Sequence, residues 1–432
     1  MHLLLPSLFL LFSLSLSAQE LYFPPNHSTG TWETMDPSEL GYCTEEIDAL
    51  YQFLEDNNTK SFLLLKDGKI VLEQYFGTYE QDSLYVWNSA GKSLRAVLVG
   101  IAQEQGFLDI DDPTSDHLGV GWTNATPEQE AQITIRNQIT MTTGLNPLYG
   151  HCTDPECLRY LAEPASFWFY HNGPYSLTKE VLEAATSQSL NILTNNWIET
   201  PLGMGLSFWF EFGYNTIYLS RARDMARFGL LIQAGGQWDG TTVLGDTEYL
   251  NAMIQPSQDL NPSYGYLWWL AGQESYINPG GLQSFPGSIA PSAPDDVYLA
   301  AGKDGQYISI SPGTGLMMVR QGPSPDTSAT AVSLHNVIWE RIMSLNCSPN
   351  SVEESSPLDR LSIYPNPAVT DRVWVKGLPA QGATLSLFDQ QGRLLQQRLT
   401  ARTISVADLA AGTYHLRVQL DNAERSFTLV KP

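Results

Sequence analysis

The sequence predicts an α+β domain followed by a small all-β domain, and three patterns support this prediction. The dipeptide Asp67-Gly68 separates two apolar runs, which is a strong signal for a β-hairpin. Further on, apolar residues recur at helical spacing until Gly106, where the predicted helix ends. Residues 359–432 alternate apolar and polar positions between glycine-containing turns, as expected for a β-sandwich.

The first residues predict export. Residues 3–16 are almost wholly apolar and small Ser17 and Ala18 follow, so we expect a signal peptide over residues 1–18. The apolar run is too short to span a bilayer comfortably. Its weak basic region leaves a retained anchor as the alternative. No later segment is long and apolar enough for a transmembrane helix, so we expect no integral membrane segment after cleavage.

Charge and cysteine spacing exclude several classes of function. The 432 residues contain 46 Asp and Glu against 23 Lys and Arg, a net charge of −23. So acidic a chain is a poor candidate for binding nucleic acid or an anionic membrane. The seven histidines and four cysteines show no C-x-x-C or H-E-x-x-H spacing, so we expect no metal site and no cofactor.

Composition also divides the chain into domains. Residues 348–358 are rich in Pro, Ser and Glu, which is typical of a linker. In residues 359–432, nine Lys and Arg outnumber six Asp and Glu, the reverse of the balance in the rest of the chain. We therefore expect a main domain over residues 38–347, then the linker and a separate C-terminal domain.

The C-terminal region resembles a type IX secretion sorting domain. The resemblance rests on LSIYPNPA (361–368), FDQQGR (388–393), LAAGTYHLRV (409–418) and the terminal LVKP. It implies that residues 359–432 engage the type IX secretion machinery of a Bacteroidetes-type bacterium. The protein then passes the periplasm to the outer cell surface or the medium, and such domains are commonly removed on the way. A generic carbohydrate-binding or immunoglobulin-like module is the alternative.

The main domain contains a serine and a lysine placed to act together. In an S-x-x-K motif, Ser89 and Lys92 share one helical face. A desolvated lysine loses its proton and can accept one from serine, and the helix N-terminus favours the developing negative charge. A second copy runs from Ser176 to Lys179, and N-capping explains either serine as well. The chain has no G-x-S-x-G motif, and its histidines show no pattern for a Ser-His-Asp triad.

Four blocks, in order, resemble the serine hydrolase superfamily of class C β-lactamases, D-alanyl-D-alanine carboxypeptidases and related esterases. They are GFLDIDDP (106–113), ITIRNQITMTTGL (133–145), DMARFGLLIQAGGQWDG (224–240) and AGKDGQYI (301–308). The resemblance covers residues 40–345. It implies a β-lactamase-like fold, with an antiparallel sheet flanked by the terminal helices, a mostly helical lobe, and an active site between them.

The resemblance assigns catalytic roles to matching residues. Ser89 matches the nucleophile that forms an acyl-enzyme, Lys92 the lysine that activates it, and Tyr170 the tyrosine that shares their protons. A tyrosine acts as a base only if neighbouring lysines lower its pKa from about 10. Asn172 matches the residue that hydrogen-bonds a substrate amide or carbonyl. An aromatic core strand ending in a turn at Asn172 is the alternative.

A third motif, Lys303-Asp304-Gly305, lies between two strand-like runs. The resemblance implies that Lys303 attracts a substrate carboxylate, that Gly305 lets substrate lie close to the strand, and that the N–H of Gln306 joins that of Ser89 in an oxyanion hole. Asp304 departs from the family pattern, which usually has a small hydroxyl residue there, and this favours ester or amide hydrolysis over β-lactam cleavage. A solvent-exposed hairpin turn is the alternative.

Two disulfides are expected in an exported protein. Cys152 and Cys157 bracket a four-residue loop that a disulfide would close. Because the terminal helices of the superfamily pack side by side, the resemblance implies a second disulfide between Cys43 and Cys347.

These features together predict an exported serine hydrolase that cleaves an ester or amide of a small-molecule or peptide-like acyl substrate. The alternatives are a D,D-peptidase or β-lactamase that acts on cell-wall-like amides, and a catalytically silent surface protein that binds peptides or glycans.

Overall fold

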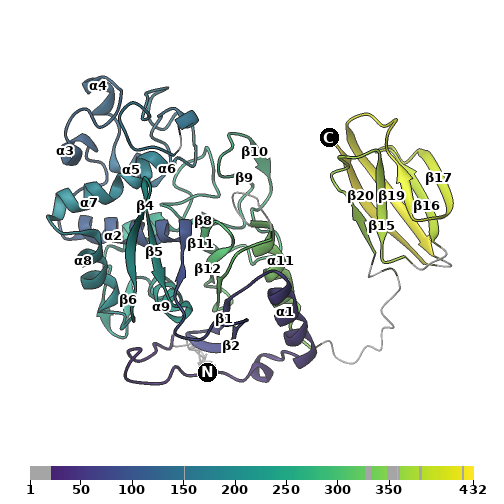
Figure 1. Cartoon of the computed structure of the whole chain (residues 1–432), viewed down its shortest axis with the longest axis horizontal. Coiled ribbons are helices and arrows are strands. Elements are labelled where there is room, and N and C mark those ends of the chain that lie inside the picture. The colour runs from purple at the N-terminus through teal and green to yellow at the C-terminus, as the bar shows by residue number, and fades with distance from the viewer. Residues whose placement is uncertain are drawn as a thin grey trace, which may run out of the picture. The chain divides into compact units, whose positions relative to one another are not determined.

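The computed structural model describes residues 21–149, 151–325, 332–347, 358, 361–378, 382–420 and 423–432. The expected signal peptide and almost all of the expected linker lie outside the described residues. The chain forms two compact units, Met1–Cys347 and Ser348–Pro432, and each is described by itself (Figure 1).

The first unit combines helices and strands. Its described helices are η1 (Pro37–Leu40), α1 (Thr44–Asp56), η2 (Asn88–Ala90), α2 (Gly91–Glu104), α3 (Ser115–Leu118), α4 (Pro127–Glu130), α5 (Ile135–Ile139), η3 (Pro147–Tyr149), α6 (Asn172–Ser176), α7 (Thr178–Thr186), α8 (Leu190–Thr194), η4 (Asn195–Glu199), α9 (Ala222–Gln233), α10 (Thr247–Met253) and α11 (Val332–Met343). Its described strands are β1 (Ser61–Lys66), β2 (Lys69–Tyr75), β3 (Tyr85–Val86), β4 (Phe208–Phe212), β5 (Asn215–Ser220), β6 (Gln237–Trp238), β7 (Thr241–Thr242), β8 (Trp269–Leu270), β9 (Ser275–Ile277), β10 (Ser284–Pro286), β11 (Tyr298–Gly302), β12 (Gln306–Ser311) and β13 (Leu316–Gln321).

The main sheet is antiparallel, with the strand order β2-β1-β13-β12-β11-β8. The predicted hairpin joins β1 to β2, and Lys66 pairs with Lys69 across its turn. Asp67 and Gly68 have φ angles of 48° and 88°, the left-handed values that a two-residue hairpin turn requires. The hairpin prediction is therefore confirmed.

Helices cover both faces of this sheet. On β12, Ser309 bonds Trp339 of α11, with 2.9 Å between Nε1 and Oγ. On the same strand, a Cβ added at Gly229 of α9 would lie 2.8 Å from Ile308. Because neighbouring strand residues point to opposite faces, α11 and α9 pack on opposite sides. Helix α1 lies beside α11, as Figure 1 shows.

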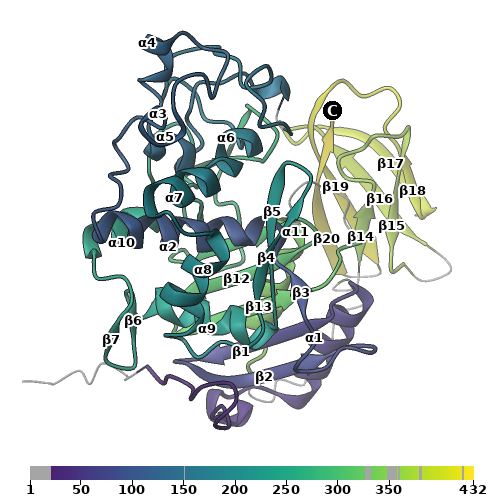
Figure 2. The same cartoon turned by 60° about the vertical axis from the view of Figure 1, so that its left-hand side comes forward.

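Helix α2 runs through the centre of the unit. The expected apolar positions, such as Leu94 and Ile101, are buried, and Gly106 follows the helix with a φ of 73°. Every residue from Gly91 to Ala102 is buried, including polar ones, so the helix is enclosed rather than half-exposed. The lobe formed by α3 to α8 packs against this helix through α7 (Figure 2).

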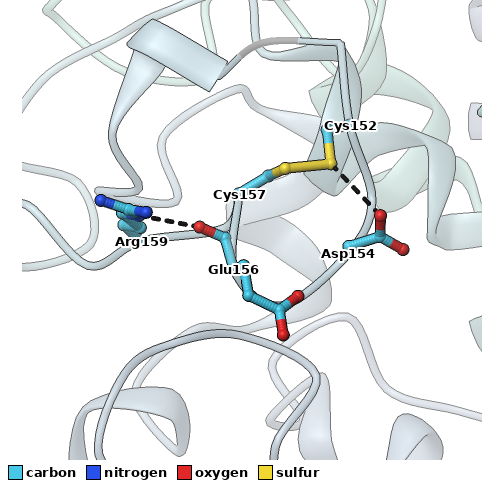
Figure 3. Close-up of a disulfide and its surroundings, with 5 residues drawn as sticks. All are labelled: Cys152, Asp154, Glu156, Cys157 and Arg159. Atoms are coloured by element: carbon cyan, nitrogen blue, oxygen red, sulfur yellow. Dashed lines mark hydrogen bonds between the residues drawn. A yellow bond between two sulfur atoms is a disulfide. The ribbon is translucent and has the colours of Figure 1, made fainter.

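Both expected disulfides are present. Cys43 and Cys347 join the start of α1 to the segment after α11, with their Cα atoms 5.1 Å apart, and the N–H of Cys43 donates to the carbonyl of Leu345 at 2.9 Å. Cys152 and Cys157 close the four-residue loop shown in Figure 3, where Arg159 also donates from Nε to the Glu156 carbonyl at 2.8 Å.

The described residues of the second unit form two packed sheets with their own apolar core, so the predicted β-sandwich is confirmed. One sheet has the order β14-β15-β18 and the other β17-β16-β19-β20. The strands are β14 (Ser362–Tyr364), β15 (Arg372–Lys376), β16 (Ala383–Phe388), β17 (Leu394–Ala401), β18 (Thr403–Ser405), β19 (Gly412–Leu420) and β20 (Ala423–Lys431). Within the described ranges of the whole chain, no helix has the length and apolar character needed to cross a membrane.

Candidate active site

Ser89 lies in a tight turn at the start of α2. The turn, η2, begins with Asn88 at a φ of 50°, a left-handed conformation that asparagine tolerates better than most residues. The N–H of Ala90 donates to the carbonyl of Trp87 at 3.0 Å and closes the turn. Ser89 therefore faces the positive end of the α2 dipole, where negative charge is stabilised.

Lys92 follows Ser89 by one helical turn and is almost fully buried, with 2% of its surface exposed. Its Nζ lies 3.8 Å from the ring centre of Tyr175 and 5.2 Å from that of Tyr170. Within the described residues, Nζ has no hydrogen-bond partner. Burial, and then the charge of Arg95, hold the pKa of Lys92 well below its usual value. Both causes favour the neutral form of the amine.

Tyr170 precedes α6 and stacks on Trp269, with 5.9 Å between ring centres. Burial raises the pKa of Tyr170, while a hydrogen bond with Ser89 acts in the opposite direction. The structure thus brings Ser89, Lys92 and Tyr170 together. Burial thus favours the neutral form of Lys92 and the protonated form of the phenol, which is the opposite of what a tyrosine base beside a positive lysine needs.

The two residues after Tyr170 begin helix α6. Asn172 is its first residue and is half-buried. His171 precedes the helix with 2% of its surface exposed, and neither ring nitrogen has a hydrogen-bond partner in the described part of the chain. Burial, and then the charge of His151, lower the pKa of His171 to about 4, so this ring is neutral at physiological pH.

Lys303, Asp304 and Gly305 form the turn that joins β11 to β12. The Lys303 side chain is exposed, and no ion pair with Asp304 is present. Asp304 and Gly305 have φ angles of 66° and 85°. A Cβ at Gly305 would lie 2.6 Å from Nη1 of Arg320, so the glycine is needed for the turn and this contact, a different reason from the expected approach of substrate.

Gln306 is the first residue of β12, the strand next to β11 in the sheet. It pairs with Gly302 across the hairpin, and its fully buried side chain donates to the Gly322 carbonyl at 2.8 Å and accepts from the Gly322 N–H at 3.0 Å. These contacts fix the Gln306 side chain to Gly322, the residue that follows β13, rather than to the turn that carries Ser89.

Two residues that the sequence analysis missed connect the end of β11 to that turn. A Cβ at Gly302 would lie 2.3 Å from the Trp87 carbonyl oxygen and 3.1 Å from the Ala90 nitrogen, so only glycine fits. Asn88 donates from Nδ2 to the carbonyl of Lys303 at 2.9 Å. The available signal was the place of Gly302 at the end of an apolar run, directly before Lys303.

The second S-x-x-K motif has a different environment. Lys179 lies near three carboxylates, with Nζ 3.1 Å from Glu211, 3.8 Å from Glu180 and 3.9 Å from Glu183. Partial burial lowers the pKa of Lys179, but the hydrogen bond with Glu211 and the acidic charges outweigh it and raise the pKa overall. Lys179 is therefore a charged ammonium and not a base for Ser176.

The described residues offer no metal centre: nowhere in these ranges do three His, Cys, Asp or Glu side chains gather closely enough to hold an ion. The buried His335 on α11 forms a hydrogen bond with Ser309, with 2.8 Å between Nε2 and Oγ, and burial lowers the pKa of His335 to about 3.

Comparison with known families agrees with this geometry. Residues 56–321 match the family model described as Beta-lactamase, which spans more than half of the chain. The chain belongs to the β-lactamase family. Members of this β-lactamase family are serine hydrolases, including penicillin-binding-protein-like proteins, and the matched region contains the Ser89 turn, Tyr170 and the β11–β12 turn.

Solved structures show the same β-lactamase-like fold at low sequence identity. A protein of Bacteroides dorei, provisionally named a β-lactamase, is 16% identical with a TM-score of 0.56, covering 70% of this chain and 99% of its own. A Bacillus anthracis protein, provisionally named a 6-aminohexanoate-dimer hydrolase, is 16% identical with a TM-score of 0.54, covering 76% and 90%. An octameric penicillin-binding-protein homologue of Pyrococcus abyssi is 16% identical with a TM-score of 0.52, covering 88% and 90%.

The C-terminal unit of this β-lactamase family member has a separate match. Residues 362–431 match the model of the secretion system C-terminal sorting domain. A domain of this type indicates type IX export and a secreted or cell-surface location, typical of Bacteroidetes.

Proposed function

We propose that this protein is an exported serine hydrolase that cleaves an ester or amide through an acyl-enzyme on Ser89. The observation that supports this most strongly is the environment of Lys92: a buried amine without a hydrogen-bond partner in the described residues, one turn from a serine at a helix start, where burial favours its neutral form. A neutral lysine in that position is an available proton acceptor. A structural lysine would instead be paired, as Lys179 is.

In the first step, Lys92 takes the proton of the Ser89 hydroxyl, and Oγ attacks the substrate carbonyl carbon. The attack gives a tetrahedral intermediate with a negative oxygen. This charge forms beside the N-terminus of α2, and the protein needs two N–H donors aimed at it.

We assign these donors to the backbone N–H groups of Ser89 and Lys303, in place of the expected Gln306. The residues on either side of Ser89 both contact the end of β11, Ala90 through Gly302 and Asn88 through the Lys303 carbonyl. Neither the Ser89 nor the Lys303 N–H donates a hydrogen bond within the described residues. Gln306 lies on the next strand and is held to Gly322.

Collapse of the intermediate breaks the bond to the leaving group, which must gain a proton. In this proposal the protonated phenol of Tyr170 delivers it and is reprotonated from Lys92; the hydrogen bond of Tyr170 with Ser89 and the 5.2 Å between Lys92 Nζ and its ring centre support this role. A water molecule then attacks the acyl-enzyme, gives its proton back through the same groups, and releases the acid and free Ser89.

The turn after β11 supports an ester or amide substrate without a carboxylate at this position. Asp304 places a negative charge beside Lys303, and the Lys303 side chain is exposed. A substrate carboxylate would be attracted by Lys303 but repelled by Asp304, so the turn gives it little net stabilisation. One structural relative is provisionally named a hydrolase of the 6-aminohexanoate dimer, and that name is compatible with amide hydrolysis.

Reaction with a fluorophosphonate, followed by intact mass and peptide mapping, tests the proposal. We expect one adduct, on Ser89, and its loss in Ser89→Ala. Ser176→Ala in the second motif is the matched control and keeps the adduct. An adduct on Ser176, or folded wild-type protein that never reacts, contradicts the proposal and favours a silent binding role. The peptidase or β-lactamase alternative is favoured if the enzyme that reacts with the fluorophosphonate hydrolyses a β-lactam or a D-Ala-D-Ala peptide but leaves esters and simple amides intact.

A further inference from the structure

Helix α2 carries two buried basic side chains, a lysine and an arginine, one helical turn apart. Lys92 has 2% of its surface exposed and Arg95 has none. Both lie against the ring of Tyr175, with Lys92 Nζ at 3.8 Å and Arg95 Cζ at 5.0 Å from its centre. The lysine and the guanidinium are therefore close neighbours inside the protein.

The charge of Arg95 is not balanced by a carboxylate. Its Nη1 donates to the Ser176 carbonyl at 3.3 Å and lies 3.5 Å from the Thr178 hydroxyl, and its Nη2 donates to the Thr216 hydroxyl. The ring of Trp209 lies 4.8 Å from Cζ. These partners are neutral, and no ion pair of Arg95 exists within the described residues. A guanidinium stays charged in proteins even when buried.

A protonated Lys92 would therefore be a second unbalanced cation beside the first. Two like charges that pack against the same aromatic ring repel each other strongly when water is excluded. The repulsion is relieved when the lysine loses its proton, because the guanidinium of Arg95 stays charged. Burial lowers the pKa of Lys92, and the charge of Arg95 is the next cause.

We propose that Arg95 is a positioning residue whose fixed charge keeps Lys92 in its neutral form and so ready to accept the Ser89 proton. This inference rests on the proposed function for its importance in catalysis, but the effect of Arg95 on Lys92 is a separate physical claim. Nothing in the sequence motif demands an arginine three residues after the lysine.

The other titratable groups around α2 do not replace Arg95. Tyr170 and Tyr175 face Lys92 from the segment around α6, and burial raises the pKa of each, so both are neutral. On α10, the hydroxyl of Tyr249 donates to the Ala96 carbonyl at 2.7 Å, and burial raises its pKa too. On α7, Lys179 is paired with surface acids.

Two pairs of variants separate charge from structure. Arg95→Met removes the charge, and Arg95→Lys keeps a cation in place. Thr216→Asp puts a carboxylate beside the intact guanidinium, and Thr216→Asn is its uncharged match. The second pair leaves Arg95 and its packing in place, so it tests the claim even where Arg95→Met fails to fold.

The direct measurement is a pH titration of the ¹³Cε signal of Lys92, assigned with Lys92→Met, because it needs no catalysis. We expect the midpoint to rise by about one pH unit in Arg95→Met and Thr216→Asp, and to stay in Arg95→Lys and Thr216→Asn. Equal midpoints in all folded variants overturn the inference. A raised midpoint in Thr216→Asn overturns it as well, because the shift would then be structural.

The rate of fluorophosphonate labelling gives the functional readout. At pH values below the Lys92 midpoint, Arg95→Met and Thr216→Asp should react about tenfold more slowly than wild type, and the difference should disappear at high pH. A wild-type protein that does not label, but whose Lys92 midpoint moves as expected, contradicts the proposed function and leaves Arg95 with its role. A wild-type protein that labels, with a midpoint that never moves, contradicts the inference alone.

Discussion

The side-chain amide of Asn88 donates a hydrogen bond to the backbone carbonyl of Lys303, with 2.9 Å between the two atoms. It ties the turn before α2 to the end of β11, two segments more than 200 residues apart in the sequence. We expect Asn88→Gly, which keeps the left-handed conformation, to slow labelling of Ser89 about tenfold with a stability loss of about 1 kcal/mol. Lys303→Ala, which keeps the carbonyl, is the control. A wild-type labelling rate in Asn88→Gly would show that this bond does not align the site.

Gly302 leaves no room for a side chain beside the Ser89 turn. In Gly302→Ala, the new Cβ would lie 2.3 Å from the Trp87 carbonyl oxygen, so the strand and the turn must separate. We expect labelling of Ser89 to fall at least about a hundredfold, since small displacements of this kind are costly in catalysis. Gly281→Ala is the matched control because only the Asn278 carbonyl, at 3.5 Å, lies near its Cβ. Equal labelling rates in the two variants would refute the prediction.

Lys92 should lower the stability of the folded protein at neutral pH. Its pKa in the folded state is well below the usual value, so between these two pKa values the unfolded chain binds more protons at Lys92 than the folded chain does. The penalty that Lys92 places on stability therefore shrinks with rising pH up to the ordinary lysine pKa of about 10.4. We expect Lys92→Met to have a higher free energy of unfolding at pH 7, with the gain shrinking toward pH 10, as measured by urea unfolding.

Lys179→Met provides the opposite sign. The pKa of Lys179 is raised in the folded state, so its contribution is favourable below the ordinary lysine pKa and disappears only at higher pH. The variant should be slightly less stable than wild type at pH 7. A stabilised Lys179→Met, or a destabilised Lys92→Met, would contradict the burial argument.

The two disulfides should differ in their effect on stability. Cys43 and Cys347 are 304 residues apart and Cys152 and Cys157 only five, and a longer closed loop restricts the unfolded chain more. We expect Cys43→Ser with Cys347→Ser to cost about 4 to 5 kcal/mol, and Cys152→Ser with Cys157→Ser about 2 kcal/mol. Thermal unfolding of both double variants measures the difference, and a larger loss from the short loop would reverse the expected order.

Local signals were sufficient where a feature depends on neighbouring residues. Asp67 and Gly68 form the expected turn because their left-handed conformations are a property of those two residues. Ser89 and Lys92 lie in two consecutive helical segments, η2 and α2, and both approach Tyr170, as their three-residue spacing led us to expect. The alternation of the C-terminal region likewise became a sandwich with its own core.

Features that depend on distant contacts were not accessible in the same way. The sequence shows Lys303, Asp304 and Gly305 as a motif, but only the contacts of Gly302 and of the Lys303 carbonyl with the turn before α2 show which residues border Ser89. The burial of Lys92, and the absence of an acid beside Arg95 in the described residues, result from how α2 is enclosed by the lobe. No pattern within α2 reports that enclosure.

The bond between Cys43 and Cys347 turns the backbone of the first unit into a covalent ring. A protease that cuts once at any exposed site inside this ring leaves two fragments that remain attached. Such a nicked molecule migrates as one band on a non-reducing gel and as two after reduction. Removal of the C-terminal sorting domain, which lies outside the ring, shortens the band under both conditions, so the two kinds of processing can be told apart in one experiment.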